Sequence, residues 1–226
     1  MGVNVMKNNY IYILGTSVVA FLMFLIVVFI TSGERGQLLD QSVMSLIDDK
    51  SSAGVLKFME LISMLGSTEL MLLLTIALLG ILIVKKERFH FLFLAVVSLG
   101  GVILNFVVKF IIHRERPGGE IKDIELFDFN FSIPSYSFPS GHTMRVTILF
   151  IFLMYMCFYY VKKSLIRYIA YVSLSVLLVL VAVSRLFLDA HFFSDVIGAL
   201  FLGAAWFYGM FYLFKRIQMK YAEPHI

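Results

Sequence analysis

Long runs of apolar residues restrict the fold of this chain more than any other feature. Six runs have about the length that a helix needs to cross a bilayer, roughly 17–25 residues. They cover residues 11–31, 68–84, 89–112, 142–161, 165–187 and 192–214. We therefore expect an all-α integral membrane protein, a bundle of six transmembrane helices, with residues 1–226 forming a single membrane-embedded domain.

The composition excludes several other classes of protein. Of the 226 residues, 60% are hydrophobic and 15% are charged, whereas a soluble domain is nearer half apolar and a quarter charged. This excludes a soluble domain, a disordered chain and a nucleic-acid binder. The single cysteine, Cys157, excludes an intramolecular disulfide framework and any multi-cysteine metal site.

The basic residues predict the orientation in the membrane. The first run is too long for a signal-peptide core and no cleavage pattern follows it, so we expect it to stay as an anchor. The positive-inside tendency then places both termini and two short loops in the cytoplasm. The ten basic residues on that side are Lys7, Lys85, Lys86, Arg88, Lys162, Lys163, Arg167, Lys215, Arg216 and Lys220, against two acids, Glu87 and Glu223.

Two longer segments should then lie outside. Residues 36–66 carry apolar positions at helical spacing, so we expect one or two short helices on the outer surface, without a chemical role. The loop 113–139 has an open role and could help to select a substrate. We interpret its charges as a solvated face and its phenylalanines as interfacial anchors; they are Glu120, Asp123, Glu125, Asp128, Phe127, Phe129 and Phe131.

The first polar cluster lies at the end of the third run. Lys109 and Arg116 are seven residues apart, nearly two helical turns, which places them on one face. Because the residue before a proline avoids the helical region, we expect the helix to end near Arg114 and Arg116 to fold back over Lys109. Two fixed cations suit a phosphate group, although snorkelling to lipid headgroups is the alternative. We prefer the snorkelling interpretation for Arg114 and the phosphate interpretation for Lys109. His113 stays unassigned.

The second cluster, Pro139-Ser140-Gly141-His142, opens the fourth run. Serine is a good N-cap, glycine allows close approach to the backbone, and the first helical turn offers free N–H donors to an anion. The alternative is an ordinary helix cap with an interfacial histidine. Arg145 follows one turn later, and its role is open.

The third cluster joins the fifth and sixth runs. It contains Ser184, Arg185, His191 and Asp195. We expect His191 and Asp195, four residues apart, to be neighbours on one helix face. A carboxylate beside an imidazole raises its basicity, which suits an oriented nucleophile, although such a pair is often structural.

Together the three clusters resemble the type 2 phosphatidic acid phosphatase family, which includes bacterial phosphatidylglycerophosphatases and undecaprenyl-pyrophosphate phosphatases. The family pattern is K-x6-R-P, then P-S-G-H, then S-R-x5-H-x3-D, and every specified position is matched between residues 109 and 195. The resemblance implies a membrane lipid phosphatase, an enzyme of a bacterial plasma membrane whose active site faces outside. Its expected partners are a lipid phosphate substrate and the bilayer, with no nucleic acid.

The resemblance also implies roles for single residues. His191 would attack phosphorus to form a phosphohistidine, Asp195 would orient it, and His142 would act as general acid and base. The implied phosphate-binding residues are Lys109, Arg116, Ser140, Gly141 and Arg185. No metal and no cofactor is expected. His90 and His225 should lie on the cytoplasmic side, away from the site.

Several alternatives stay open at this point. The leading substrate is undecaprenyl pyrophosphate, followed closely by phosphatidylglycerophosphate and phosphatidic acid. A lipid phosphotransferase could use the same scaffold, and a phosphate-lipid transporter would also hide charges in a helical bundle, although at mid-membrane rather than at one end. A haloperoxidase-like use of the anion site and a non-catalytic binding protein are weaker alternatives. The oligomeric state is not predicted.

Overall fold

The computed structural model describes residues 2–48, 52–117, 122–126 and 129–222, with side chains described for 10–47, 52–117, 136–218. These residues form eight helices and one two-stranded hairpin. The helices are α1 (Gly2–Thr31), α2 (Glu34–Asp48), α3 (Ala53–Met64), α4 (Thr68–Val84), α5 (Arg88–Ile112), α6 (Gly141–Tyr160), α7 (Ser164–Phe187) and α8 (Phe193–Ala222). The hairpin strands are β1 (Lys122–Leu126) and β2 (Phe129–Ser135).

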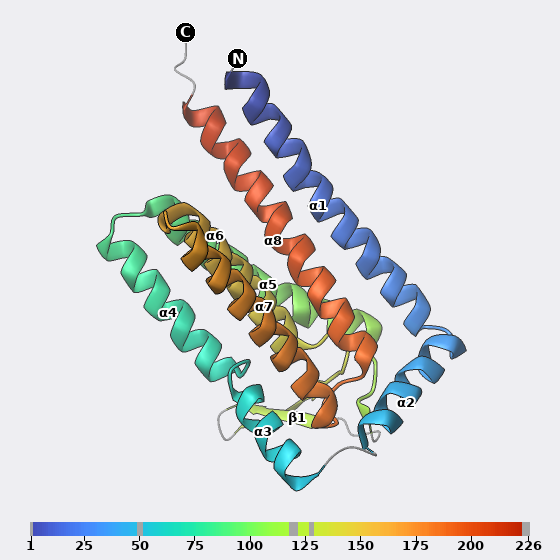
Figure 1. Cartoon of the computed structure of the whole chain (residues 1–226). Coiled ribbons are helices and arrows are strands. Elements are labelled where there is room, and N and C mark those ends of the chain that lie inside the picture. The colour runs from blue at the N-terminus through green and yellow to red at the C-terminus, as the bar shows by residue number, and fades with distance from the viewer. Residues whose placement is uncertain (1, 49–51, 118–121, 127–128, 223–226) are drawn as a thin grey trace.

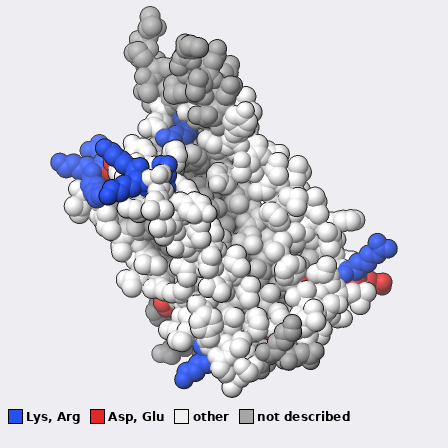
Figure 2. All heavy atoms as spheres, viewed as in Figure 1, with Lys and Arg blue, Asp and Glu red and all other residues white. Residues whose placement is uncertain are grey.

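Within the described residues, six helical segments are long and apolar enough to cross a membrane, as the sequence predicts. They are Tyr10–Thr31, Ala53–Val84, Arg88–Ile112, Gly141–Tyr160, Ser164–Phe187 and Phe193–Gln218. Their flanks expose large apolar side chains, such as Phe29, which is 83% exposed. On the face shown in Figure 2, charged residues gather towards the two ends and leave an uncharged belt between them. Such a belt suits contact with lipid rather than water.

The bundle has two different ends (Figure 1). Both termini lie at one end, while α2, α3 and the hairpin lie at the other, which we call the α2–α3 end. Because α5 and α7 run towards the α2–α3 end, and α6 and α8 start there, the ends of these four helices lie together at it. This arrangement brings residues from distant parts of the chain to one place.

Glycines allow the helices to pack closely. A methyl group added at Gly100 would lie 2.4 Å from Cζ2 of Trp206, and one at Gly101 would lie 2.4 Å from Cδ1 of Ile148. The indole Nε1 of Trp206 donates a hydrogen bond of 2.9 Å to the carbonyl of Val97. These contacts fix α5 against α8 and α6, because the two glycines let the helices approach closely.

The segment 36–66 contains two helices, α2 and α3, which agrees with the expectation of one or two. Their position on the outer membrane surface stays a prediction. Asp40 of α2 is only 1% exposed, so this helix places a carboxylate inside the protein. Residues 36–66 also supply polar contacts that the sequence did not indicate, since Asp40 accepts from Arg114 and Ser63 accepts from Arg185.

Part of the expected loop 113–139 is a β-hairpin. Strands β1 and β2 pair antiparallel, with Lys122 opposite Ser135 and Leu126 opposite Phe129. The register shifts between Ile124 and Leu126, where the strand has a bulge or irregularity. The interpretation of this segment's acids and phenylalanines falls outside the described side chains.

Candidate functional site

A cavity of about 300 Å³ opens where the four helix ends meet. Six of the residues singled out in the sequence line this one cavity: Lys109, Arg116, Gly141, His142, Arg185 and His191. Arg145 lines it as well, together with Thr68, Val102, Asn105, Phe106 and Phe110. The three sequence clusters therefore converge, although up to 82 positions separate Lys109 from His191 in the chain.

The predicted pair of His191 and Asp195 is present, but its geometry differs from the expected helix face. Helix α8 begins at Phe193, so His191 precedes the helix and Asp195 occupies its first turn. The Nδ1 atom of His191 lies 3.5 Å from Oδ2 of Asp195. The turn before α8 fixes this position, because the N–H groups of Ala190 and His191 both donate to the carbonyl of Arg185.

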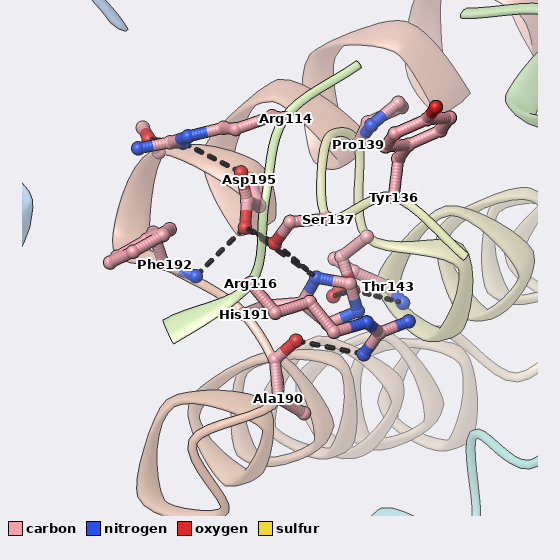
Figure 3. Close-up of polar contacts among 12 residues, drawn as sticks. Arg114, Arg116, Tyr136, Ser137, Pro139, Thr143, Ala190, His191, Phe192 and Asp195 are labelled. Atoms are coloured by element: carbon pink, nitrogen blue, oxygen red, sulfur yellow. Dashed lines mark hydrogen bonds and ion pairs between the residues drawn. The ribbon is translucent and has the colours of Figure 1, made fainter. Parts of the chain in front are cut away.

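Ser137 completes this pair and was not identified from the sequence. Its hydroxyl donates to Oδ2 of Asp195 and lies 3.4 Å from Nδ1 of His191 (Figure 3). Oδ2 of Asp195 also accepts from the N–H of Phe192 at 2.8 Å. Since Nδ1 of His191 faces these two groups, its Nε2 is the ring nitrogen left to face the cavity.

Arg114 supports Asp195 from the other side. Its Nη1 lies 2.7 Å from Oδ1 of Asp195, and its Nη2 lies 2.5 Å from Oδ2 of Asp40. The guanidinium also lies over the ring of Phe192, 4.4 Å from the centroid. The prediction that Arg114 snorkels to lipid headgroups is therefore wrong: two buried carboxylates share its positive charge.

The surface helices contribute two further polar contacts. Asp40 of α2 accepts hydrogen bonds from Ser194, at 2.9 Å from its N–H and 2.6 Å from its hydroxyl. Ser63 of α3 accepts a hydrogen bond from Nη1 of Arg185. Asp40 lies one turn after Gly36 and one turn before Met44, and all three are buried, so the structure places it on the buried face of α2, which the sequence did not indicate.

The predicted pair of Lys109 and Arg116 lies at the cavity, and the helix ends between the two residues, as the sequence predicts. Helix α5 ends at Ile112, and His113 follows with a left-handed φ of 51°, so no helix connects the two cations. Lys109 donates to the carbonyls of Tyr136 and Ser137. Arg116 donates to the carbonyl of Ala190 at 3.0 Å. Both side chains are thus held at the cavity by backbone carbonyls from other segments.

Helix α6 begins as the sequence predicts, with Ser140 as its N-cap. The hydroxyl of Ser140 accepts from the N–H of Thr143 at 3.5 Å and from the Thr143 hydroxyl at 3.1 Å. Ser140 is fully buried and is not among the cavity-lining residues, whereas Gly141 and His142 are. The first turn of α6, whose N–H groups lack partners within the helix, therefore faces the cavity at Gly141 and His142.

Burial lowers the pKa of two site residues that lie outside the helices, His191 and Arg116. It lowers the pKa of His191 to about 4, against the opposing effect of Asp195, which favours the charged ring. At neutral pH the ring is therefore uncharged and its Nε2 carries a lone pair. Burial also lowers the pKa of Arg116, while the charge of Asp195 raises it.

Two other histidines lie away from this cavity. His90 contacts Glu87 and Tyr155 near the start of α5, at the end of the bundle that carries the termini. His113 stacks edge-on against Tyr136, with ring centroids 4.6 Å apart, and does not line the cavity. His225 lies outside the described residues.

The cavity is basic rather than suited to a metal ion. Among the described residues, no three histidine, cysteine or carboxylate side chains gather in a way that could hold a metal. The cavity-lining residues include four cations, Lys109, Arg116, Arg145 and Arg185, and no carboxylate. Four basic side chains and a helix N-terminus around one space have the chemistry that suits an anion.

Comparison with known proteins agrees with this interpretation. Residues 90–219, more than half of the chain, match the family described as the PAP2 superfamily. Phosphatidylglycerophosphatase B of Bacillus subtilis (strain 168) is 32% identical over 121 residues, which is 52% of this chain and 53% of that protein. The chain thus matches about half the length of this curated relative.

Solved structures support the fold as well. The chain superposes with a TM-score of 0.74 on a crystal structure described as the first transmembrane PAP2 type phosphatidylglycerolphosphate phosphatase from Bacillus subtilis, at 26% identity. The match covers 91% of this chain and 96% of that one. LpxE of Aquifex aeolicus shares the fold alone, with a TM-score of 0.52 and 22% identity over 81% of this chain and 96% of that one. The six-span helical fold is confirmed, and the chain is a multi-pass membrane protein.

Proposed function

The chain belongs to the PAP2 superfamily, and on that premise we propose that it is a membrane lipid phosphatase. It hydrolyses a phosphate monoester or diphosphate at the polar end of a lipid and releases inorganic phosphate. The observation that carries the proposal is the common cavity of His142 and His191, which four cations line. Phosphoryl transfer requires mainly positioning and charge stabilisation, and this cavity can supply both.

In the first step, Nε2 of His191 attacks phosphorus and forms a phosphohistidine. Its Nδ1–H faces Asp195 and Ser137, so the lone pair lies on Nε2, and the carboxylate stabilises the positive charge that develops on the ring. The lowered pKa of His191 keeps the ring neutral and able to attack at neutral pH. His142, at the start of α6, protonates the oxygen that leaves.

In the second step, His142 removes a proton from water, which attacks the phosphohistidine and releases phosphate. Lys109, Arg116 and Arg185 neutralise the non-bridging oxygens in both steps. The N–H groups at Gly141 and His142 add the positive end of the α6 dipole. Ser140 acts through its cap of α6 rather than by direct contact, since its buried hydroxyl bonds Thr143.

The proposed substrate is a lipid whose headgroup faces the outer side of a bacterial plasma membrane. The site lies at the end of the bundle opposite both termini (Figure 1), and the basic residues near the termini favour a cytoplasmic position for them. The names of the Bacillus subtilis relatives support phosphatidylglycerophosphate as a substrate. Undecaprenyl pyrophosphate and phosphatidic acid have the same phosphate chemistry and belong in the same test.

The test is phosphate release by purified protein in detergent with EDTA, using these three lipids and ranking kcat/KM. We expect activity without added metal, and its loss by at least about 1,000-fold in His191→Gln, since a nucleophile is removed. His113→Gln is the matched control, because His113 lies at the same end but does not line the cavity. Full activity in His191→Gln, or no phosphate release from any of the three lipids, would contradict the proposal. Recovery of the phosphate on an added acceptor lipid would identify a phosphotransferase instead.

A further inference from the structure

Asn105 of α5 is a polar residue of the cavity to which the proposed reaction assigns no role. It lines the cavity one helical turn before Lys109, and it is only 9% exposed. A buried amide inside a membrane-spanning helix is costly unless its donors and its acceptor find partners. The partners of this amide therefore indicate what the residue does.

The nitrogen of the amide is already used within the protein. Nδ2 of Asn105 donates a hydrogen bond of 3.2 Å to the carbonyl of Pro139 and lies 3.5 Å from Sδ of Met144. Because a carbonyl oxygen can only accept, the nitrogen must face Pro139, and this contact fixes the orientation of the whole amide. It also joins α5 to the segment that leads into α6.

The oxygen of the amide lies beside the first residue of α6. A methyl group added at Gly141 would lie 3.4 Å from Oδ1 of Asn105, so this oxygen is close to the residue that precedes His142. Among the described residues, the hydrogen bonds of Asn105 all use its nitrogen, and none uses Oδ1. A polar atom of a buried side chain that lines a cavity and lacks a protein partner is a position at which a bound water is expected.

Other acceptors are rare among the described side chains that line the cavity. The lining cations can only donate hydrogen bonds, and they are Lys109, Arg116, Arg145 and Arg185. In the proposed second step, Nε2 of His191 carries the phosphoryl group, and His142 takes a proton from water. The lining side chains that can still accept are Asn105 and Thr68, of which Thr68 is exposed at the start of α4.

The proposed second step gives a partner to only one of the two protons of the attacking water. His142 accepts the first proton. If the second O–H bond has no acceptor, the water can rotate about the first hydrogen bond, and its lone pair is not directed at phosphorus. A second acceptor fixes both O–H bonds, which orients the lone pair for attack. Oδ1 of Asn105, next to Gly141, can supply this acceptor.

We propose that Asn105 positions the attacking water, with Oδ1 accepting a hydrogen bond from one O–H group while His142 removes the other proton. This inference rests on the proposed phosphatase function. As the water oxygen bonds to phosphorus, the bond between phosphorus and Nε2 of His191 breaks, and its electron pair returns to the ring. One proton passes to His142, and the other leaves with the phosphate. Asn105 gains and loses no proton.

The experiment uses methanol, which has one O–H proton where water has two. Purified protein in detergent with EDTA receives methanol and whichever of the three lipids named above it hydrolyses fastest, and phosphorus NMR measures phosphate and methyl phosphate. Both products form from one phosphohistidine, so their ratio does not depend on lipid binding or on the first step. Asn105→Leu removes the acceptor but keeps the size of the side chain. We expect the ratio of methyl phosphate to phosphate to rise about 5- to 10-fold, the effect of one lost hydrogen bond between uncharged groups.

Two further variants separate the acceptor from the contact with Pro139. Asn105→Asp keeps an acceptor oxygen but loses the N–H donor, so its product ratio should stay near that of the wild type. Thr68→Val removes the other neutral acceptor that lines the cavity and should leave the ratio unchanged. A second measurement needs no methanol: base-quenched Asn105→Leu should hold at least about 5-fold more phosphohistidine than the wild type in the steady state, because only the step that uses water is slowed.

The outcomes separate this inference from the proposed function. A ratio that is unchanged in Asn105→Leu, or raised equally in Asn105→Asp, overturns the role in positioning water while the phosphatase activity stands. A ratio raised by Thr68→Val alone assigns the water to Thr68 and overturns it as well. If the wild type forms no methyl phosphate, an unchanged level of phosphohistidine in Asn105→Leu overturns it. A wild type that releases no phosphate from any of the three lipids overturns the proposed function, and this inference with it.

Discussion

Replacement of Arg114 by glutamine should destabilise the protein more than any other single charge removal at this end of the bundle. Arg114 is the shared partner of Asp40 and Asp195, at 2.5 Å and 2.7 Å. These carboxylates are 1% and 0% exposed. Glutamine keeps part of the hydrogen bonding but removes the positive charge, so two buried carboxylates lose the guanidinium that stabilises them.

The size of the effect follows from this burial. Removal of one partner from a buried ion pair costs about 3–5 kcal/mol, because the other charge stays buried without compensation. Asp40→Asn should cost less, about 1–2 kcal/mol, since Arg114 keeps its contact with Asp195 and the new amide can still accept from Ser194. The two changes together should cost less than the sum of the single changes, by about 0.5–3 kcal/mol, because both act on one network.

The assay is the free energy of unfolding in detergent micelles, followed by the fluorescence of the only tryptophan in the chain. Trp206 is a suitable probe because it bonds Val97 and packs on Gly100, so it reports the packing of α8 on α5. Arg35→Gln, an exposed arginine on α2, is the matched control and should cost less than about 0.5 kcal/mol. If Arg114→Gln were as mild as the control, the buried network described here would be wrong.

Three shorter predictions concern the site itself. When the pH falls from 6.5 to 4, the free energy of unfolding of the wild type should fall by about 3 kcal/mol more than that of His191→Gln, as measured by thermal unfolding. Burial lowers the pKa of His191 to about 4, so the unfolded state binds more protons than the folded state in this pH window. Ser137→Ala should lower kcat about 5- to 10-fold with little change in KM, since it removes a hydrogen bond that orients Asp195 but does not touch substrate; steady-state kinetics test this. Lys109→Met should lower kcat/KM for every lipid by about 10- to 100-fold in the same assay, and an unchanged value would remove Lys109 from the phosphate site.

The helices and the convergence of the three clusters could be predicted because they depend on local information. Apolar runs of spanning length identify helices without knowledge of their neighbours. The alternation of direction along a bundle then places the ends of spans three and five beside the starts of spans four and six. Residues at those ends, such as Lys109, His142 and Arg185, consequently had to meet, and they line one cavity.

The supporting residues could not be found in this way, because their partners are remote in the sequence. Asp40 contacts Arg114, which is 74 positions away, and Ser137 contacts Asp195, which is 58 positions away. A serine between aromatic residues and an acid on an amphipathic helix are both ordinary surface features when they are considered alone. The interpretation of Arg114 was wrong for the same reason, since interfacial arginines commonly reach lipid headgroups unless a buried acid attracts them.

The hairpin and the helix ends show a second limit, which concerns backbone geometry. The proline after Arg116 predicts that the third span ends near Arg114, and α5 ends two residues earlier, at Ile112, before the left-handed His113. The start of the last span is predicted less well, because His191 precedes α8 instead of lying within it. There the spacing brings His191 and Asp195 together through a turn, which periodicity alone does not distinguish from a helix.

The most direct test of the central claim is to trap the phosphoryl group on the protein. His142→Gln should be mixed with p-nitrophenyl phosphate, whose leaving group needs no proton, and quenched rapidly in base, in which phosphohistidine survives. Peptide mass spectrometry then locates the phosphate. The proposed mechanism predicts that phosphate accumulates on His191, because the second step lacks its base. Phosphate on another residue, or rapid release without any phosphorylated His191, would contradict it.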